Sequence, residues 1–517
     1  MSRSASGMST TCTHRYVGLL SLPIAATALL WPAIYNGQAF FSSDTSAYVR
    51  GADAAVHAAT GISSDWSPMA RRPAPSTIAR ARTGTASLAD ADASRFRSMS
   101  SLQDQNVMGG RSIYYGALLY AGSLAGNFWL TVLIQSVLLT MSVALVLQAC
   151  NVNGAERFFV AMAILCVTPA AFFVSYLTPD VFAGLTILGC AVLIADSHQQ
   201  NGWKRLFWLA LLCLALLAHT SHVLLATGML AAGLLVRARY ARSAGAAGLL
   251  TIVVALLVAV LGNAAFNIGV KHVLGRAPIY PPFITARLID DGPGYEYLRR
   301  TCPGSGFVAC RFLGGLPLRS DDFLWNPDPK RGVFFASDGP TRRSLSEEQY
   351  RFAWAVVRDD PLDQVAVSAS NMLRQAGAVG LAEFRYTEWD KAFFAEKLPA
   401  DTYASMRQTA AYRGAMPTTA LSALSYAAVV TALAYLLYAY RRSSARGEAL
   451  LPTYTVLTAL TVFGVVLNAA VCGAISGPHD RYQARVIWLI PLSALILDFC
   501  VRDQWWAKIL ARHPRAK

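Results

Sequence analysis

The stretch GLLTIVVALLVAVLGNAAF, residues 248–266, is almost entirely apolar and close to the length that a helix needs to cross a bilayer. Nine further stretches dominated by Leu, Val, Ala and Ile resemble it. Together they predict an all-helical polytopic membrane protein with ten spans. The other nine lie at residues 16–35, 127–149, 157–176, 181–196, 205–219, 223–237, 419–440, 451–472 and 486–501.

The composition supports this fold class. Charged residues make up 15% of the 517-residue chain, whereas a soluble globular protein carries about 25%, and this shortfall excludes a disordered chain. Within 205–237, the polar group from His219 to His222 favours two helices joined by a tight turn over one long kinked element. Four runs are only about 15–16 residues long, so they must extend or thin the bilayer locally: 181–196, 205–219, 223–237 and 486–501.

The Lys and Arg residues of the short loops predict the orientation, because such residues gather on the cytoplasmic side. With residues 1–15 in the cytoplasm, the inner segments, including the basic tail 502–517, carry +11 of the net charge of +15. The basic character therefore requires no nucleic-acid partner. The charge pattern and the high Ala and Arg content favour a bacterial inner-membrane protein with both termini cytoplasmic. The first run ends in WPAIY, residues 31–35, rather than in a cleavage site, so we expect it to remain as an anchor.

Two long segments, 36–112 and 267–418, then lie outside the membrane, and the last three spans follow within 419–501. In the first segment, residues from about 52 to 110 have the character of an insertion, which we expect to be mostly flexible. Order should resume near Gly109, and the apolar run 114–125 suits a helix lying at the outer interface before the second span.

The second outer segment is long enough for a domain, which we expect to be mostly helical. Residues 344–347, SLSE, have the form of a capping box and predict a helix to about Arg358. Pro361 can begin another helix to about Ala378. Cys302 and Cys310 both fall here and could form a disulfide in an oxidising compartment, or stay reduced.

Acidic residues stand at two outer ends of apolar runs. Asp44 follows the first span, where its carboxylate could accept a proton from a hydroxyl group or, alternatively, cap a helix. Asp180, in Thr178-Pro179-Asp180, lies between the third and fourth spans. There it suits the first turn of a helix, but a buried acid costs a few kcal/mol, so we also expect a partner for it.

Histidines and arginines form two further candidate groups. His219 and His222 could bind metal, but a pair of histidines at a turn is a weak metal site. Two alternatives are favoured: the histidines are polar turn residues, or one of them contacts a phosphate or sugar. His479, Arg481 and Arg485 precede the last span. The two arginines are four residues apart and share a helix face, where they could bind phosphate bidentately or extend toward lipid head groups.

Three short motifs resemble the GT-C superfamily of polytopic glycosyltransferases, which includes the protein O-mannosyltransferases and the lipid A aminoarabinose transferases. Asp44, with Tyr48 four residues later, resembles the acid of their first outer loop. Gly110-Arg111 followed by Tyr114-Tyr115 is similar to a stretch before their second span, although its prolines are missing. Asp180 is similar to their acid between spans three and four. The resemblance is best over 16–266, and residues 276–418 match no known pattern.

The resemblance implies an inverting transfer of a sugar from a polyprenyl-phosphate carrier to an envelope glycan, lipid or protein at the outer face. Asp44 would be the general base, and Asp180 would orient the base or the acceptor. Some members use a divalent metal, which this sequence does not decide, and no metal ligand is assigned. The residues expected to bind substrate or its phosphate are Arg111, Tyr48, His219, His222, His479, Arg481 and Arg485.

Two other function classes fit a polytopic chain. A lipid-linked sugar flippase or polysaccharide exporter would need a polar path through the bilayer but not Asp44. A membrane O-acyltransferase would use a histidine within the membrane, for which His219 or His222 could serve. An ion-coupled pump is disfavoured, because it usually needs charged residues inside its spans and they are nearly absent here.

Overall fold

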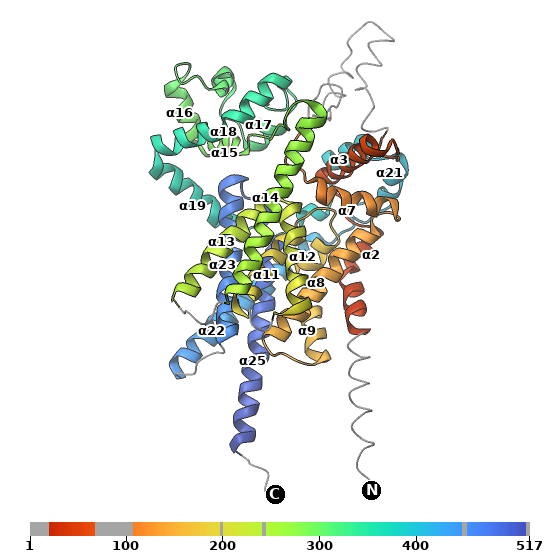
Figure 1. The fold of residues 1–517 in the computed structure, drawn as a ribbon, viewed down its shortest axis with the longest axis vertical. Coiled ribbons are helices and arrows are strands. Elements are labelled where there is room, and N and C mark those ends of the chain that lie inside the picture. Colours follow the sequence, from red (N-terminus) through yellow and green to blue (C-terminus); the bar gives the residue numbers. More distant parts are fainter. Residues whose placement is uncertain (1–19, 68–106, 197–199, 240–244, 447–451, 513–517) are drawn as a thin grey trace.

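The computed structural model of the protein describes residues 20–67, 107–196, 200–239, 245–446 and 452–512. Within these ranges the chain is helical and contains no strand, only isolated bridges between Phe40 and Tyr176 and between Met108 and Ile279. A bundle of long helices carries a smaller helical domain at one end (Figure 1). The predicted all-helical class is therefore confirmed.

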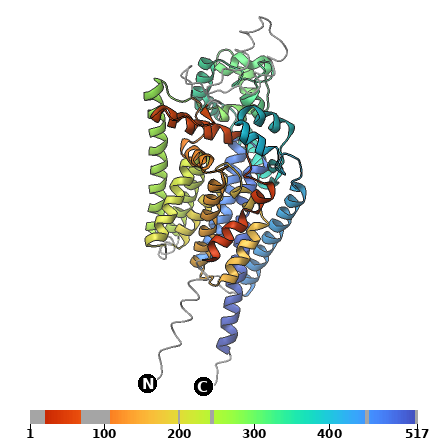
Figure 2. The same cartoon turned by 90° about the vertical axis from the view of Figure 1, so that its right-hand side faces the viewer.

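Six helical segments among the described residues are long and apolar enough to cross a membrane. Two shorter apolar helices, Leu20–Leu29 and α11 (Val181–Ala195), accompany them. The turned view shows the long helices side by side (Figure 2). The six segments lie in α8 (Trp129–Ala149), α13 (Thr220–Arg239), α14 (Ala246–Leu274), α22 (Thr418–Arg446), α23 (Pro452–Ile475) and the pair α24 (Asp480–Ile487) and α25 (Leu489–Arg512).

Prolines interrupt two of the ten predicted spans. Residues 16–35 divide into helix Leu20–Leu29 and α2 (Trp31–Asn36), in which proline occupies the first turn. Residues 157–176 divide into α9 (Ala155–Cys166) and α10 (Pro169–Val174), because proline cannot continue a helix. Ten uninterrupted spans are thus not observed, and the number of membrane crossings stays a prediction.

Other boundaries agree better with the sequence. Residues 205–237 form two helices, α12 (Gly202–Ala218) and α13, which meet at His219 as predicted. The short α11 needs no greater length, because every one of its residues is buried among neighbouring helices. A Cβ atom on Gly184 would lie 2.7 Å from the Trp488 ring, so glycine permits this close packing.

The first outer loop contains two helices that pack on each other, α3 (Ser43–Thr60) and α7 (Ile113–Leu124). The predicted interfacial helix is α7. The first part of the insertion predicted at residues 52–110 is structured, since α3 continues to Thr60 and the buried Asp53 accepts hydrogen bonds from the hydroxyl groups of Ser64 and Ser67. Residues 70–101 lie outside the described residues.

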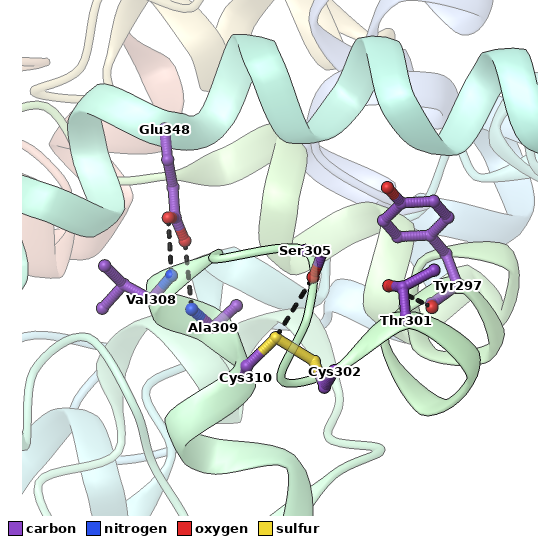
Figure 3. The surroundings of a disulfide bond; sticks show 8 residues. All are labelled: Tyr297, Thr301, Cys302, Ser305, Val308, Ala309, Cys310 and Glu348. Atoms are coloured by element: carbon purple, nitrogen blue, oxygen red, sulfur yellow. Dashed lines mark hydrogen bonds between the residues drawn. A yellow bond between two sulfur atoms is a disulfide. The ribbon is translucent and has the colours of Figure 1, made fainter.

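The second outer segment divides into two parts. Residues 279–356 enclose a hydrophobic core of their own. Cys302 and Cys310 form a disulfide there, and the Glu348 carboxylate accepts hydrogen bonds from the amides of Val308 and Ala309 at 2.7 and 3.1 Å (Figure 3). The elements of this outer domain are α15 (Phe283–Asp291), α16 (Pro293–Thr301), η1 (Val308–Gly315), α17 (Ser320–Trp325) and α18 (Gly339–Asp359).

The capping box predicted at residues 344–347 is wrong, because α18 begins five residues earlier. The Asp338 side chain caps it by accepting a hydrogen bond from the Thr341 amide at 2.9 Å. Asp338 caps the helix in place of Ser344, since its carboxylate can accept hydrogen bonds from the unpaired amides of the first turn. The next helix, α19 (Pro361–Gly377), begins at the predicted proline.

Residues 379–416 pack on the membrane bundle instead of on the outer domain. Phe384 lies among aromatic rings from the first loop and the third predicted span, with ring centroids 5.0 Å from those of Phe40 and Tyr176. The Tyr386 hydroxyl accepts a hydrogen bond from the Phe41 amide at 2.8 Å. This part comprises η2 (Ala382–Phe384), α20 (Glu388–Lys397) and α21 (Ala400–Met406).

Candidate active site

A buried carboxylate, Asp180, binds two arginines at the N-terminal end of α11. Arg481 donates from Nε to Asp180 Oδ2 at 2.8 Å, and Arg485 donates from Nη1 to Oδ1 at 3.0 Å. The Thr178 hydroxyl donates to Oδ2 at 2.6 Å. Both arginines reach the same carboxylate because their four-residue spacing puts them on one face of α24. Asp180 therefore acquires the partners that its burial requires.

Arg485 is the deeper of the two arginines. Its Nη2 donates to Asn468 Oδ1 at 3.0 Å and lies 3.2 Å from the Cys472 sulfur, both on α23. The Ser221 hydroxyl is 3.5 Å from the same nitrogen. Only 2% of the Arg485 side chain is exposed. Its charge is therefore held inside the protein, where Asp180 and Asn468 are its partners.

A second carboxylate, Asp44, lies beside this pair and closer to the surface. It occupies the first turn of α3, where the side chain of Ser42 is the cap. Arg111 donates to Asp44 Oδ1 at 2.5 Å, and Arg481 Nη1 is 3.7 Å from Oδ2. The side chains of Asp44 and Arg111 are 24% and 27% exposed. Arg481 thus joins an accessible carboxylate to a buried one.

Backbone contacts bring these distant segments together. The Phe40 amide donates to the Ser175 carbonyl, and the Leu177 amide donates to the Phe40 carbonyl, both at 2.9 Å. The Thr45 hydroxyl also donates to the Leu177 carbonyl at 3.0 Å. These bonds tie the start of α3 to the turn before Asp180. The two carboxylates therefore have defined relative positions.

Arg111 is positioned by the start of α7. The side chain of Ser112 caps that helix and donates to the Leu217 carbonyl at 2.6 Å, which attaches it to the end of α12. Gly116 allows α7 to approach α3, since a Cβ atom there would lie 2.6 Å from the Tyr48 carbonyl oxygen. The close contact of the two helices puts Arg111 next to Asp44.

Tyrosines surround the charged groups. The Tyr48 ring packs edge-on against Tyr115 at 5.3 Å, and the Tyr115 hydroxyl donates to Gln135 at 2.9 Å. The Arg481 guanidinium lies 5.4 Å from the centre of the Tyr176 ring. Tyr48 is buried, and burial raises its pKa, so it stays protonated. Tyr48, which the sequence predicts to bind substrate, is thus a buried neighbour of Asp44.

The arginines lower the pKa of both aspartates. Burial alone would raise the pKa of Asp44, but the guanidinium groups of Arg111 and Arg481 outweigh it and hold the pKa below its usual value. Asp180 is likewise subject to burial, which Arg481 and Arg485 outweigh, so its pKa is also lowered. Both carboxylates are ionised at neutral pH. Three guanidinium groups then face two carboxylates, which leaves this cluster with an excess positive charge.

The predicted histidines divide between the edge of this cluster and its surroundings. His219 Nδ1 is 2.8 Å from the Ser221 hydroxyl, which itself approaches Arg485. His222 is fully buried, with Nδ1 2.8 Å from the Ala215 carbonyl oxygen. His479 lies apart: its Nε2 is 3.7 Å from Asp321 of the outer domain. Neither His222 nor His479 contacts the two aspartates.

The donor set does not suit a divalent metal. Each carboxylate is already bound by an arginine, and the surplus charge is positive, whereas Mg²⁺ and Ca²⁺ favour uncompensated carboxylate and carbonyl oxygens. Among the described residues, no three His, Cys, Asp or Glu side chains are grouped so that they could hold a metal ion.

Two residues of the site were missed in the sequence. Asn468 binds Arg485, and its position inside an apolar run is the signal that could have identified it. Glu383 is solvent-exposed and lies within electrostatic range of Arg481 and His479, whose charges favour its ionised form. No sequence signal marks Glu383, because it stands in a segment of irregular pattern.

Known proteins offer no guide to this arrangement. No family model, curated protein or solved structure matches the chain. Its function must therefore be inferred from the geometry of the charged cluster. That cluster has an accessible carboxylate and two partly exposed arginines beside the ends of apolar helices.

Proposed function

We propose that the protein is a membrane glycosyltransferase that moves a sugar from a polyprenyl-phosphate carrier to an envelope glycan, lipid or protein. The observation that carries this proposal is the position of Asp44, a quarter exposed and held between Arg111 and Arg481. A base and a phosphate site are the two parts that such a transfer needs. The resemblance of Asp44, Arg111 and Asp180 to GT-C motifs agrees with these roles.

The proposal includes a topology. Ten apolar segments cross the inner membrane of a bacterium, both termini lie in the cytoplasm, and the charged cluster faces the periplasm. The distribution of Lys and Arg over the short loops supports this orientation. The outer domain (Figure 1) then lies on the periplasmic side together with the cluster, where its disulfide would be stable.

Arg111 and Arg481 are the phosphate-binding residues in this mechanism. Both are partly exposed, and a guanidinium group can bind a phosphate through two parallel hydrogen bonds. Arg485 is buried, so its part is to hold Asp180 and, through Asp180, Arg481. Asp180 is accordingly a positioning residue, and Asp44 is the catalytic one.

The transfer step follows from these positions. Asp44 takes the proton of the acceptor hydroxyl as its oxygen attacks the anomeric carbon. The new carbon–oxygen bond forms while the bond between the anomeric carbon and the phosphate oxygen breaks, and the electron pair leaves with the lipid phosphate. The configuration inverts. Arginines stabilise the charge that develops on the phosphate, so no protonating acid is needed.

Phosphate binding would also activate the base. In the free protein the two arginines lower the pKa of Asp44 and make it a weak base. A bound phosphate draws their hydrogen bonds toward itself and adds negative charge beside the carboxylate, and both effects raise its pKa. The base becomes effective only when the donor is in place, which limits unproductive proton transfer.

A transfer assay tests the proposal. The purified protein in nanodiscs is incubated with radiolabelled polyprenyl-phosphate sugars and membrane extract, and Asp44→Asn is compared with the wild type. A matched control is Glu296→Gln, which removes a surface carboxylate of the outer domain. We expect transfer by the wild type and the control, and its loss in Asp44→Asn with the fold intact.

Other outcomes overturn the proposal. Equal transfer by Asp44→Asn would remove Asp44 from the chemistry. Translocation of intact lipid-linked sugar without transfer would identify a flippase. Transfer of an acyl group that is lost in His222→Ala but retained in Asp44→Asn would identify an acyltransferase.

A further inference from the structure

Helix α19 buries three polar side chains and exposes an apolar stripe, beside which the charged residues Asp363 and Arg374 are also exposed. Gln364, Asn371 and Gln375 lie seven and four residues apart on the buried face. Leu362, Val365 and Leu373 are 82%, 65% and 71% exposed. A surface helix of a soluble domain has the opposite arrangement, with its apolar stripe toward the core. The exposed apolar stripe therefore marks a contact surface.

The buried face of α19 is firmly attached to the membrane bundle. Gln375 exchanges two hydrogen bonds with the backbone of His479, at 2.8 and 2.9 Å. The Asn371 side chain donates to Asp291 of the outer domain at 2.8 Å. A Cβ atom on Gly473 of α23 would lie 2.8 Å from the Asn371 carbonyl oxygen. The two helices are therefore in close contact, and the apolar face of α19 has no room to turn inward.

The C-terminal end of α19 lies beside α22, farther into the bundle than the residue at which α22 begins. The Tyr426 hydroxyl donates to the Gly377 carbonyl at 3.0 Å and lies 3.3 Å from the Val379 amide nitrogen. Tyr426 stands eight residues after Thr418, where α22 begins. At a rise of about 1.5 Å per residue, that is about 12 Å along the helix. The end of α19 is thus level with residues of α22 that we expect to meet lipid.

An aromatic edge continues this apolar face onto α18. Tyr350, Trp354 and Val357 are exposed on one side of that helix, at the spacing that places residues on a common face. In Figure 1, α19 lies between α18 of the outer domain and the bundle helices. Trp and Tyr are enriched at the level of lipid head groups. The exposed side chains are therefore aromatic on α18 and aliphatic on α19, as expected for a surface that passes from the head groups into the hydrocarbon of a membrane.

We propose that the exposed face of α19 is embedded in the hydrocarbon of the outer leaflet, with Tyr350 and Trp354 at the head groups. The occupant of this surface is lipid, because the exposed apolar face of α19 lies at the same depth as exposed apolar side chains of α22, such as Val430. The helix anchors the outer domain to the membrane beside α23. This inference does not depend on the proposed glycosyltransferase activity.

Site-directed spin labelling tests the proposal in lipid nanodiscs. Labels are introduced by Leu362→Cys, Val365→Cys and Leu373→Cys, with Arg299→Cys on α16, whose side chain is 61% exposed, as the matched control. The host carries serine at Cys12, Cys166 and Cys213, because the last two are partly exposed. The full-length host without added cysteine measures background labelling. Collision rates are then measured with oxygen, which enters hydrocarbon, and with a water-soluble nickel chelate.

We expect oxygen collisions to exceed nickel-chelate collisions several-fold at the three α19 positions, and the reverse at Arg299→Cys. Nickel-chelate collisions at α19 as frequent as those at the control would place the face in water and overturn the proposal. Low collision rates with both reagents would indicate a covering protein surface, such as a second copy, and would overturn it as well.

Discussion

Asp44 and Asp180 are the same residue type, share Arg481 as a partner and lie at the same end of the bundle, yet their surroundings differ. The Asp180 side chain is 3% exposed and bonded on both oxygens, whereas Asp44 is 24% exposed. A buried charge with satisfied hydrogen bonds is fixed, because any departure leaves unpaired charges in a medium of low dielectric. An exposed carboxylate can release its arginine partner and bind a ligand instead. The contrast shows that burial, more than residue type, separates a positioning carboxylate from a reactive one.

The largest expected effect is that of Asp180→Ala. Removing this carboxylate leaves Arg485 buried without its counter-charge, which costs about 3–5 kcal/mol. We expect a large fall in the thermal unfolding midpoint of the protein in nanodiscs, together with loss of any activity. Asp44→Ala is the matched control, with a much smaller fall. Equal midpoints for the two variants would mean that burial does not distinguish the aspartates.

Asp44→Asn should separate stability from activity. The amide keeps the shape of the side chain but cannot accept the proton, and loss of a general base reduces rates by about 10² to 10⁴. We expect that reduction in kcat with an unfolding midpoint close to that of the wild type. A parallel loss of stability and activity would assign Asp44 a structural role like that of Asp180.

Arg111→Lys tests whether the arginine beside the accessible carboxylate binds the donor phosphate. Lysine keeps the charge but loses the planar pair of donors, and a charge-assisted hydrogen bond contributes about 1.5–3 kcal/mol. We expect the KM for the lipid-phosphate donor to rise about tenfold or more, with kcat affected less. The control is Arg299→Lys on the surface of the outer domain, which should leave KM unchanged. An unchanged KM in Arg111→Lys would exclude Arg111 from donor binding.

The pH dependence tests the activation of Asp44 by its ligand. In the free protein the pKa of Asp44 is below its usual value, so the ion pair is retained above about pH 4 and lost as the pH falls through the lowered pKa. The acid limb of kcat/KM reports this free state, and the limb of kcat reports the complex. We expect the kcat limb at higher pH. Coincident limbs would contradict a change in the surroundings of Asp44 on donor binding.

Glu383→Gln should have the smallest effect. Glu383 is solvent-exposed, so water screens its charge from the nearby Arg481 and His479. We expect Glu383→Gln to change the free energy of unfolding by no more than about 0.5 kcal/mol at neutral pH. Strong destabilisation would show that its negative charge balances the arginines.

The site residues could be chosen from the sequence because polar side chains stand out between apolar runs. Asp44, Asp180, Arg481 and Arg485 each border such a run, and the structure brings all four together. The roles of the two arginines could not be separated in this way. Their spacing predicts a shared face, but only the packing of α23 shows that Arg485 is buried and Arg481 accessible.

Packing also decided the features that were predicted wrongly or missed. Residues 378–418 carry no sequence pattern that assigns them to the outer domain or to the membrane bundle. The aromatic contacts of Phe384 join them to the bundle. In α19 the helical period was evident, but which face is buried was not. That choice was made by Gln375 and Asn371 finding partners on neighbouring elements.

The sequence by itself determined the helical class, most helix positions and the candidate charged residues, because apolar length, proline and local polarity act over a few neighbouring residues. Only the tertiary structure decided which charges pair, which carboxylate stays accessible and which face of α19 is left apolar and exposed. The reason is physical. The energy of a charge depends on its depth and on partners up to several hundred residues away, such as Asp180 and Arg485, and neither depth nor partner is encoded by spacing along the chain.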